Sequence, residues 1–369
     1  MSVKAALIGT GIFSRDVYSK LFVEQCDKVT LRHVWSRSHA SAEEFRERYA
    51  VNSTAHYGDT GLSTILHDPE VQLVVVVLPV QSALKVVQDA LSAGKHVIEE
   101  KPIAGTVSEG ITAIKQYRGL QGQLGPSPLW MLAENYRYEA VFEAACQIAP
   151  GVLGSIIKLD LVANMAMDKT NKYYGSAWRR DTQGCPGGMI MESSVHFVSA
   201  LRMLAHACGL GEAREVSAQT AHVKEDLSDP DSVVGVVRFQ HGSTPASVSI
   251  TLAASQLDWS LKAVGTEGSL EVSRGGWNGS KAGYTLTWKR ANDADPQVKT
   301  FPFSGVQNEF SSFITLVSQH HASGPSSVLG SHEEVRASPE EGVRDLALVE
   351  ALLLSGAQGG SAVDVQHVA

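Results

Sequence analysis

The sequence predicts an α/β protein in which a doubly wound parallel sheet is followed by an α+β domain with an open, mainly antiparallel sheet. Strand-like and helix-like segments alternate about five times before residue 120, as is typical of a parallel sheet covered by helices on both faces. Three glycines and two prolines then fall between residues 119 and 128. Beyond them, strand-like runs follow one another directly, which is typical of antiparallel sheets.

The length of 369 residues favours two domains, because single cores stop growing near ~250–300 residues. We place the boundary in the glycine and proline cluster, with domains at 1–125 and 126–369. The net charge is −8 and no basic run occurs, so we expect neither a nucleic acid nor a membrane as partner. The longest apolar run is far shorter than the ~20 residues that span a bilayer. Without a signal-peptide pattern or paired cysteines, we expect a cytoplasmic protein with reduced thiols.

The elements of the first domain are predicted from apolar runs and from apolar residues at helical spacing. We expect strands at 3–8, 29–35, 73–78 and 96–99, and helices at 12–25, 41–49, 82–93 and 107–117. The run at 73–78 is rich in valine without interruption, which predicts a strand covered on both faces. Ser41 and Glu44 have the capping-box spacing, so we place the start of a helix there.

The second domain combines four expected helices with five strand-like runs that are joined by short turns containing Gly, Asp and Pro. We expect helices at 138–148, 189–207, 307–321 and 338–356, and strands at 215–221, 232–239, 246–253, 259–264 and 284–288. Consecutive strands with short turns predict antiparallel pairing.

Gly9, Gly11 and Ser14 form a G-x-G-x-x-S turn between the first strand and the first helix. In a dinucleotide site the first glycine makes the turn, and the second lets the backbone approach a pyrophosphate that the helix N-terminus stabilises. The alternative is an ordinary glycine-containing turn, but the strand, turn and helix occur in the required order. We therefore expect Gly9 and Gly11, with the neighbouring Ile12 and Phe13, to bind a dinucleotide.

The second strand ends in Ser36, Arg37 and Ser38, without a carboxylate for the ribose hydroxyls of NAD. Asp27 has suitable spacing, but it precedes this strand and so falls at the wrong end of the sheet. A guanidinium between two hydroxyls suits a 2′-phosphate, because Arg can pair with the phosphate and stack on adenine. The alternative is an exposed loop arginine. We expect NADP(H) as the cofactor.

The string Ala93-Gly94-Lys95-His96-Val97, followed by Glu100-Lys101-Pro102, resembles the Gfo/Idh/MocA oxidoreductases. Further matches to this family are the glycine turn, Trp178-Arg179, Gly187-Gly188 with Glu192 and His196, and the C-terminal helix from Glu340. The resemblance covers nearly the whole chain. It implies an N-terminal Rossmann domain and a C-terminal domain whose open sheet joins homodimers or larger homo-oligomers.

The resemblance implies that Lys101 hydrogen-bonds the reacting oxygen and helps to position the nicotinamide, beside Glu100. In the family a cis peptide bond often precedes the proline at Pro102. The position of Lys101 after a strand also places it where the crevice of an open α/β sheet lies. The alternative is a surface lysine, but the strand before it and the proline behind it favour a functional one.

Glu192 and His196 are spaced i, i+4 on an expected helix, so both project from one face. The resemblance implies that the histidine gives or takes a proton, and an unperturbed imidazole, with a pKa near ~6.5, can do both at neutral pH. We expect Glu192 to orient His196, with a proton relay or a direct acid as other roles. The alternative for His196 is a satisfied core histidine.

Leu78 and Pro79 end the Val-rich strand, and we expect both at the nicotinamide. Many relatives have Thr-Pro-Asn here and a histidine three residues after the Asn, so Val80 and Ala83 replace two polar positions.

Trp178 and Arg179 match a family pair near the cofactor, although they could equally pack a domain seam. His320 and His321 are expected to be solvated at a helix end, and we expect no metal site.

These residues predict an NADP-dependent oxidoreductase that moves hydride between the nicotinamide and a carbonyl or hydroxyl carbon of a small substrate such as a sugar, polyol, aldehyde or ketone. Lys101 would polarise the oxygen, and His196 would act as the general acid or base. One alternative is a non-catalytic NADP-binding sensor, which the loss of polar residues at Val80 and Ala83 favours. Another is an enzyme that keeps its cofactor bound while it oxidises one sugar and reduces another.

Overall fold

The computed structural model describes residues 2–120, 127–324 and 327–368, which divide into two compact units. The first unit comprises residues up to Ala133 together with Glu309–Val343, and the second comprises Glu134–Asn308 and Arg344–Ala369. The predicted boundary between residues 125 and 126 lies outside the described residues. The segment Glu309–Val343, which follows the second unit's strands in sequence, packs with the first unit.

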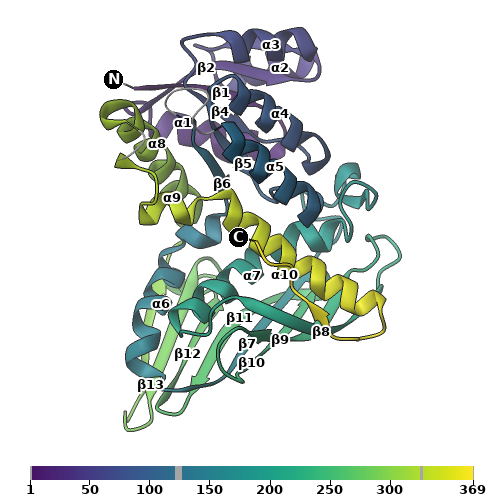
Figure 1. Cartoon of the computed structure of the whole chain (residues 1–369), viewed down its shortest axis with the longest axis vertical. Helices are drawn as coiled ribbons and strands as arrows, with labels where there is room; N and C mark the ends of the chain where they lie inside the picture. The colour runs from purple at the N-terminus through teal and green to yellow at the C-terminus, as the bar shows by residue number, and fades with distance from the viewer. Residues whose placement is uncertain (1, 121–126, 325–326, 369) are drawn as a thin grey trace. The chain divides into compact units, whose positions relative to one another are not determined.

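The first unit is built on a parallel sheet, which in the described residues has six strands in the order β3-β2-β1-β4-β5-β6 (Figure 1). The strands are β1 Val3–Ile8, β2 Val29–Ser36, β3 Thr54–Tyr57, β4 Leu73–Val76, β5 His96–Glu100 and β6 Trp130–Ala133. The helices between them are α1 Ser19–Glu24, α2 His39–Tyr49, α3 Gly58–His67, α4 Val80–Ser92 and α5 Val107–Leu120. This arrangement confirms the predicted doubly wound sheet. The chain order reverses between β1 and β4, and ligands bind at such a switch point in open α/β sheets.

The core of the first unit explains why the Val-rich run was recognisable. All four residues of β4 are buried, because the strand lies in the middle of the sheet and α4 packs against it and against β5. A strand without a solvated face needs no polar residues at alternate positions.

Several helix starts differ from the predictions; α4, for example, begins at Val80 and not at residue 82. Helix α2 begins at His39, because the extended Ser38, not Ser41, is the N-cap, and its hydroxyl accepts a hydrogen bond from the Ser41 N–H. The expected first helix contains a π-helical segment, Ser14–Tyr18, before α1. The hydroxyl of Ser19, at the junction of the two segments, donates to the Arg15 carbonyl at 2.6 Å.

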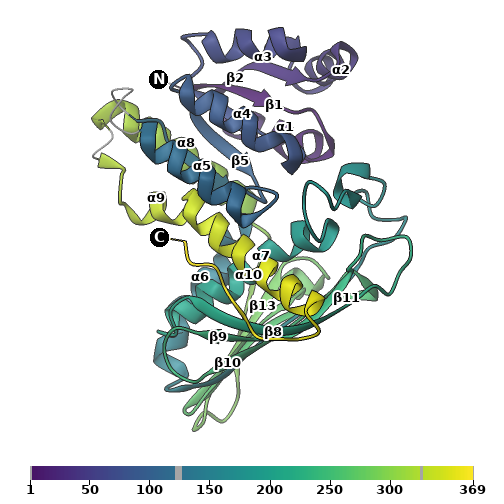
Figure 2. The ribbon, with the colours of Figure 1, turned by 45° about the vertical axis from the view of Figure 1, so that its right-hand side comes forward.

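The second unit is built on a sheet that has nine strands in the described residues, in the order β14-β13-β12-β11-β7-β10-β9-β8-β15. The strands are β7 Ile156–Ala166, β8 Ala213–Ala221, β9 Ser232–Phe239, β10 Pro245–Thr251, β11 Ala253–Gly265, β12 Gly268–Arg274, β13 Tyr284–Arg290, β14 Gln297–Phe301 and β15 Val363–Asp364. The sheet is mainly antiparallel, as predicted, but β10 pairs with β7 in parallel. The short β15 lies beside β8 at the edge (Figure 2).

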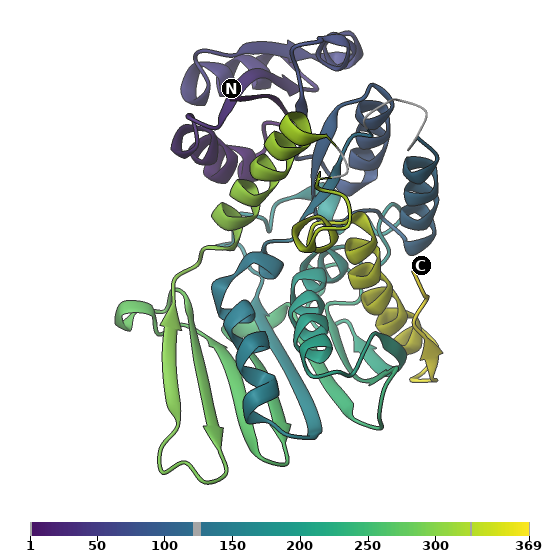
Figure 3. The same ribbon diagram turned by 60° about the vertical axis from the view of Figure 1, so that its left-hand side comes forward.

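Helices α6 Ala140–Val152 and α7 Met189–Ala207 pack on one face of this sheet (Figure 3). Because a single face is covered, side chains along β9 alternate between buried and exposed, with Val234 and Val236 on the exposed side. The helix expected at 138–148 is instead a 3₁₀ turn, Asn135–Tyr138, followed by α6. The remaining helices are α8 Gly305–Ser323, α9 His332–Arg336 and α10 Pro339–Ala357.

In the part of the chain that the structure describes, none of the helices combines the length and the apolar character that a membrane crossing requires.

Candidate functional site

The predicted cofactor residues of the first unit all lie at the carboxyl edge of its sheet. Gly9, Gly11, Ile12 and Phe13 follow β1, Ser36, Arg37 and Ser38 end or follow β2, Leu78 and Pro79 follow β4, and Glu100 and Lys101 end or follow β5. Because the strands are parallel and β1, β4 and β5 are neighbours, their carboxyl ends meet at one edge.

The glycine turn has room for a ligand on its outer side. Gly9 has a φ of 109°, and a Cβ built there would lie 2.1 Å from the carbonyl oxygen of Val77, so this position must be glycine. At Gly11, by contrast, a Cβ would meet no atom of the described residues within 4 Å. Ser14 is buried and its hydroxyl donates to the Gly9 carbonyl at 2.7 Å. The turn therefore fits a dinucleotide phosphate, which would approach the backbone at Gly11.

Arg37 is exposed directly after β2. The indole of Trp35 donates to the carbonyl of Gly58 at 2.9 Å, which ties the end of β2 to the start of α3. Ser38 caps helix α2. Arg37 therefore directly precedes the N-cap of α2, and a guanidinium and a helix N-terminus both favour an anion.

Lys101 lies directly after β5, and a cis peptide bond joins it to Pro102. The preceding Glu100 accepts a hydrogen bond from the hydroxyl of Tyr18 at 2.8 Å. Burial, followed by the charge of Glu100, raises the pKa of Tyr18 well above its usual value. Tyr18 is therefore a neutral donor that holds the carboxylate next to Lys101.

The positions where family members have polar residues after β4 are packed in this chain. Pro79 precedes the first residue of α4. Val80 and Ala83 are both buried, so their apolar side chains belong to the packed side of that helix.

In the second unit, His196 lies on α7 and is paired with a carboxylate that the sequence analysis missed. Its Nδ1 lies 2.7 Å from Oε1 of Glu134, a buried residue directly after β6. The imidazole stacks on the ring of Tyr136, with 5.1 Å between ring centroids. The side chain of His196 is 21% exposed, so it is not a fully enclosed core histidine.

Glu192, which we expect to orient His196, contacts Arg179, and the carboxylate that lies at Nδ1 of His196 is that of Glu134. The two carboxylate oxygens of Glu192 lie 3.1 and 3.3 Å from Nε and Nη2 of Arg179. The i, i+4 spacing does place both residues on α7, but Glu134 reaches Nδ1 from another element. A carboxylate that directly follows an apolar strand is the only signal that could have pointed to Glu134.

Arg179 lies close to two aromatic rings. Its guanidinium carbon lies 4.2 Å from the ring centre of Trp178 and 4.5 Å from that of Tyr173. The glycine pair before α7 brings this loop close, since a Cβ at Gly188 would lie 2.9 Å from the carbonyl oxygen of Arg179. Arg179 therefore connects the ring of Trp178 to the carboxylate of Glu192.

His320 is buried, which corrects the expectation that it is solvated, whereas His321 is exposed. The Nε2 of His320 lies 2.8 Å from the carbonyl oxygen of Ser127, and its ring packs edge to face against His96. This packing explains the burial. In the described ranges, no cluster of His, Cys, Asp and Glu side chains is arranged to hold a metal ion.

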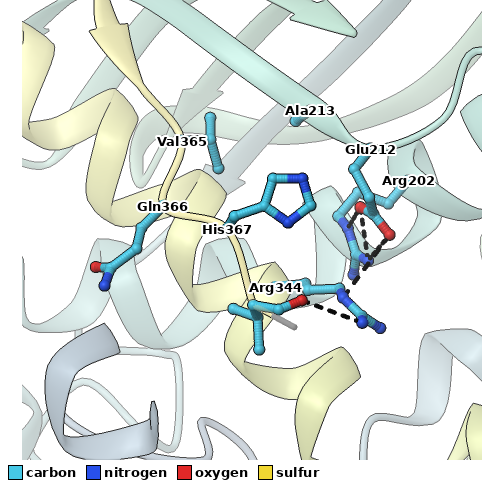
Figure 4. Close-up of a pocket in the computed structure, with 8 residues that line it drawn as sticks. Arg202, Glu212, Ala213, Arg344, Val365, Gln366 and His367 are labelled. Atoms are coloured by element: carbon cyan, nitrogen blue, oxygen red, sulfur yellow. Dashed lines mark hydrogen bonds and ion pairs between the residues drawn. The ribbon is translucent and has the colours of Figure 1, made fainter. Parts of the chain in front are cut away.

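A small cavity in the second unit contains none of the predicted site residues (Figure 4). It is lined by Arg202, Glu212, Ala213, Arg344 and residues 365–368 and has room for about one water molecule. Ion pairs of Arg202 with Glu212 and Asp345 occupy its wall, so we assign it a structural role.

The fold and the open glycine turn define a protein with a Rossmann-type dinucleotide-binding domain and a second, α+β domain, and comparison with known families identifies the family. Residues 3–125 match the sequence model of the oxidoreductase family with an NAD-binding Rossmann fold. Residues 143–271 match the GFO/IDH/MocA C-terminal domain. The chain therefore belongs to the Gfo/Idh/MocA oxidoreductase family.

Relatives of similar length include a dehydrogenase and a reductase. The chain is 28% identical to dehydrogenase FPY6 of Fusarium mangiferae, over 97% of this chain and 98% of the relative. It is 25% identical to 1,5-anhydro-D-fructose reductase of Ensifer adhaerens, over 95% and 97%. The crystal structure of an inositol dehydrogenase homolog complexed with NAD⁺ from Azotobacter vinelandii has the same fold, with a TM-score of 0.81, 17% identity and coverage of 99% and 97%.

Proposed function

We propose that the protein is an NADP(H)-dependent oxidoreductase that transfers hydride between the nicotinamide and a carbonyl or hydroxyl carbon of a small, uncharged substrate. The observation that carries this proposal is the position of Lys101 at the same sheet edge as the open glycine turn. A lysine there can meet both a nicotinamide and the oxygen of a substrate.

The choice of NADP over NAD rests on the end of β2. Arg37 is exposed next to the N-terminus of α2, and Ser36 and Ser38 flank it. A 2′-phosphate would gain a guanidinium, two hydroxyls and a helix N-terminus.

In the proposed mechanism the bound cofactor supplies or accepts the hydride. The ammonium of Lys101 donates a hydrogen bond to the reacting oxygen and stabilises the negative charge that develops on it. In reduction, His196 gives a proton to that oxygen, and in oxidation it takes the proton back. Trp178 and Arg179, which pairs with Glu192, contribute to the substrate side.

The electrostatics near α7 support an uncharged substrate such as a sugar or polyol. Arg179, which lies against the Glu192 turn of α7, already pairs with Glu192 through both carboxylate oxygens. A substrate carboxylate would have to compete with that pair.

Titration of the purified protein with NADPH and with NADH, followed by fluorescence, tests the cofactor. Absorbance at the nicotinamide band with a panel of aldehydes, ketones, polyols and sugars then tests turnover. NADPH binding with turnover supports the proposal. Binding without turnover across the panel favours a non-catalytic sensor, and cofactor that survives gel filtration favours the enzyme that keeps its cofactor bound. Absence of binding would overturn the cofactor assignment.

We also propose that two copies associate through the sheet of the second unit. Along β9, Val234 and Val236 are exposed at alternate positions, so one face of this sheet presents apolar side chains. Light scattering on the purified protein tests this association. A cytoplasmic location stays a prediction from the sequence.

A further inference from the structure

We propose that Glu134 is the positioning residue for His196: it keeps a proton on Nδ1, so that Nε2 is the ring atom that exchanges a proton with the substrate. This inference rests on the proposed function for its catalytic meaning. Its structural part, the tautomer of His196, can be tested without any substrate.

The position of Glu134 is fixed by its backbone. It directly follows β6 and caps the 3₁₀ turn Asn135–Tyr138, where its Oε1 accepts the N–H of Tyr136 at 3.1 Å. The same oxygen lies 2.7 Å from Nδ1 of His196, and the residue is 1% exposed. Because the carboxylate is held in place by the backbone, its position fixes the orientation of the imidazole that bonds to it.

Oε1 of Glu134 contacts both the Tyr136 N–H and Nδ1 of His196, and this determines which atom donates in the bond to the imidazole. An ionised carboxylate only accepts hydrogen bonds, and Oε1 already accepts one from the backbone. Nδ1 must therefore carry a proton, in the neutral ring as well as in the imidazolium. In the neutral ring this leaves Nε2 without a proton and able to accept one.

The orientation of the imidazole is also restrained from its face. His196 and Tyr136 stack with 22° between the ring planes. Tyr136 stacks in turn on Phe142, with 5.2 Å between the ring centroids, and both of these aromatic residues are buried. Rotation of the imidazole would cost this stacking together with the bond to Glu134.

The proton balance of the reaction follows from this arrangement. In reduction, the imidazolium gives its Nε2 proton to the substrate oxygen while hydride forms the new C–H bond, and a neutral ring with its proton on Nδ1 is left. The carboxylate of Glu134 would stabilise the imidazolium form, as carboxylates beside catalytic histidines do. Oxidation runs the same steps in reverse.

Glu192 provides a matched control. It lies on the same helix as His196 and is only 13% exposed, but its two oxygens face Arg179. Replacement of Glu192 should therefore leave the tautomer of His196 unchanged, whereas replacement of Glu134 should alter it.

The experiment is ¹⁵N NMR of the full-length protein labelled at histidine nitrogens, with His196 assigned by the loss of its signals in His196→Asn. In the wild type at neutral pH we expect a protonated Nδ1 and an unprotonated Nε2. Glu134→Met should shift the neutral ring toward the Nε2–H tautomer, and Glu192→Gln should not. A wild-type ring with the proton on Nε2 would overturn the proposal even if Glu134→Met fails to fold.

A kinetic measurement separates this inference from the proposed function. Once a substrate is known, Glu134→Met should lower kcat by about 10²-fold or more with KM changed by less than about threefold, because the ring loses its tautomer and not its substrate contacts. An unchanged kcat would overturn the positioning role. If no substrate turns over, the NMR measurement of the His196 tautomer still tests the role of Glu134.

Discussion

The backbone of Gly9 lies against the carbonyl group of Val77, so closely that a Cβ on Gly9 would stand 2.1 Å from that oxygen. Val77 follows β4, and Gly9 follows β1. The two residues are in contact at the switch point of the sheet, whereas Gly11 has free space beside it among the described residues. The requirement for glycine therefore has different causes at the two positions of the turn, because the protein itself excludes a side chain at Gly9 and the expected ligand excludes one at Gly11.

Replacement of each glycine by alanine should separate these causes. Gly9→Ala should destabilise the protein by more than about 2 kcal/mol, through the clash and the positive φ. Gly11→Ala should unfold at nearly the wild-type urea concentration but bind NADPH at least about tenfold more weakly. Urea unfolding and fluorescence titration measure the two effects. Equal losses of stability in both variants would contradict this division.

Arg37 should determine the preference between the two cofactors. In Arg37→Ala we expect the Kd for NADPH to rise by roughly 10–100-fold, the loss of one charge-assisted phosphate contact, with little change for NADH. Arg32 lies on β2 itself, partly exposed and paired with Glu70 at 2.5 Å, so Arg32→Ala is the matched control. A proportional loss of both cofactors in Arg37→Ala would argue against a 2′-phosphate contact.

Lys101 should affect turnover more than cofactor binding. Lys101→Met keeps the length of the side chain but removes the ammonium, so we expect kcat to fall by about 10²–10³-fold while NADPH still binds. Lys85 forms an exposed ion pair with Asp89 on α4, and Lys85→Met should have wild-type kinetics. Steady-state rates and NADPH titration provide the comparison, and retained turnover in Lys101→Met would remove this residue from the mechanism.

The protein should become less stable as the pH is lowered below about 6.5, because of His96. Burial, together with His320 and His321, lowers the pKa of His96 to about 3. Between about pH 6.5 and 3, His96 is therefore protonated in the unfolded chain but not in the folded chain. Stability is thus lost as pH falls from about 6.5 toward 3, by about 2 kcal/mol at pH 5 relative to pH 7.

Urea unfolding at the two pH values measures this loss. His96→Asn, whose amide oxygen can still accept the Leu129 N–H, should reduce it, whereas the exposed His67→Asn should leave it unchanged. An unaltered pH dependence in His96→Asn would contradict the assignment.

Asp345 should be among the most sensitive positions of the second unit. It accepts hydrogen bonds from the buried guanidinium groups of Arg137, at 2.8 Å, and of Arg202, at 2.5 Å. Asp345→Asn would remove the carboxylate that both buried guanidinium groups contact, although Arg202 keeps its pair with Glu212, so we expect a loss of about 3–5 kcal/mol in urea unfolding. Glu43→Gln, which breaks a half-exposed pair with Arg46, should cost less than about 1 kcal/mol. Similar losses in both variants would contradict the buried network.

The strands and helices were predictable where their signal is local. The valines of β4 and the run of α7 from residue 189 to 207 are recognised within a short window, because periodicity and burial coincide there. The start of α2 was missed by two residues, since Ser38 and Ser41 are both capping residues and only the backbone at Ser38 is extended.

The parallel pairing of β10 with β7 was not predictable from consecutive strands. The two strands are separated by β8 and β9 in sequence, and their register, such as Val248 opposite Leu161, is set by contacts across the sheet. The same holds for the segment Glu309–Val343, which packs with the first unit after a long excursion.

The sequence by itself determined the fold class, the glycine turn and the lysine after β5, because each depends on neighbouring residues whose spacing carries the information. Only the tertiary structure decided which carboxylate serves His196. Glu192 has the helical spacing, but its oxygens are taken by Arg179, and Glu134 reaches the ring from 62 residues away in sequence. A contact between distant segments leaves no periodic signal, since it is fixed by packing and by the cost of burying an unpaired charge.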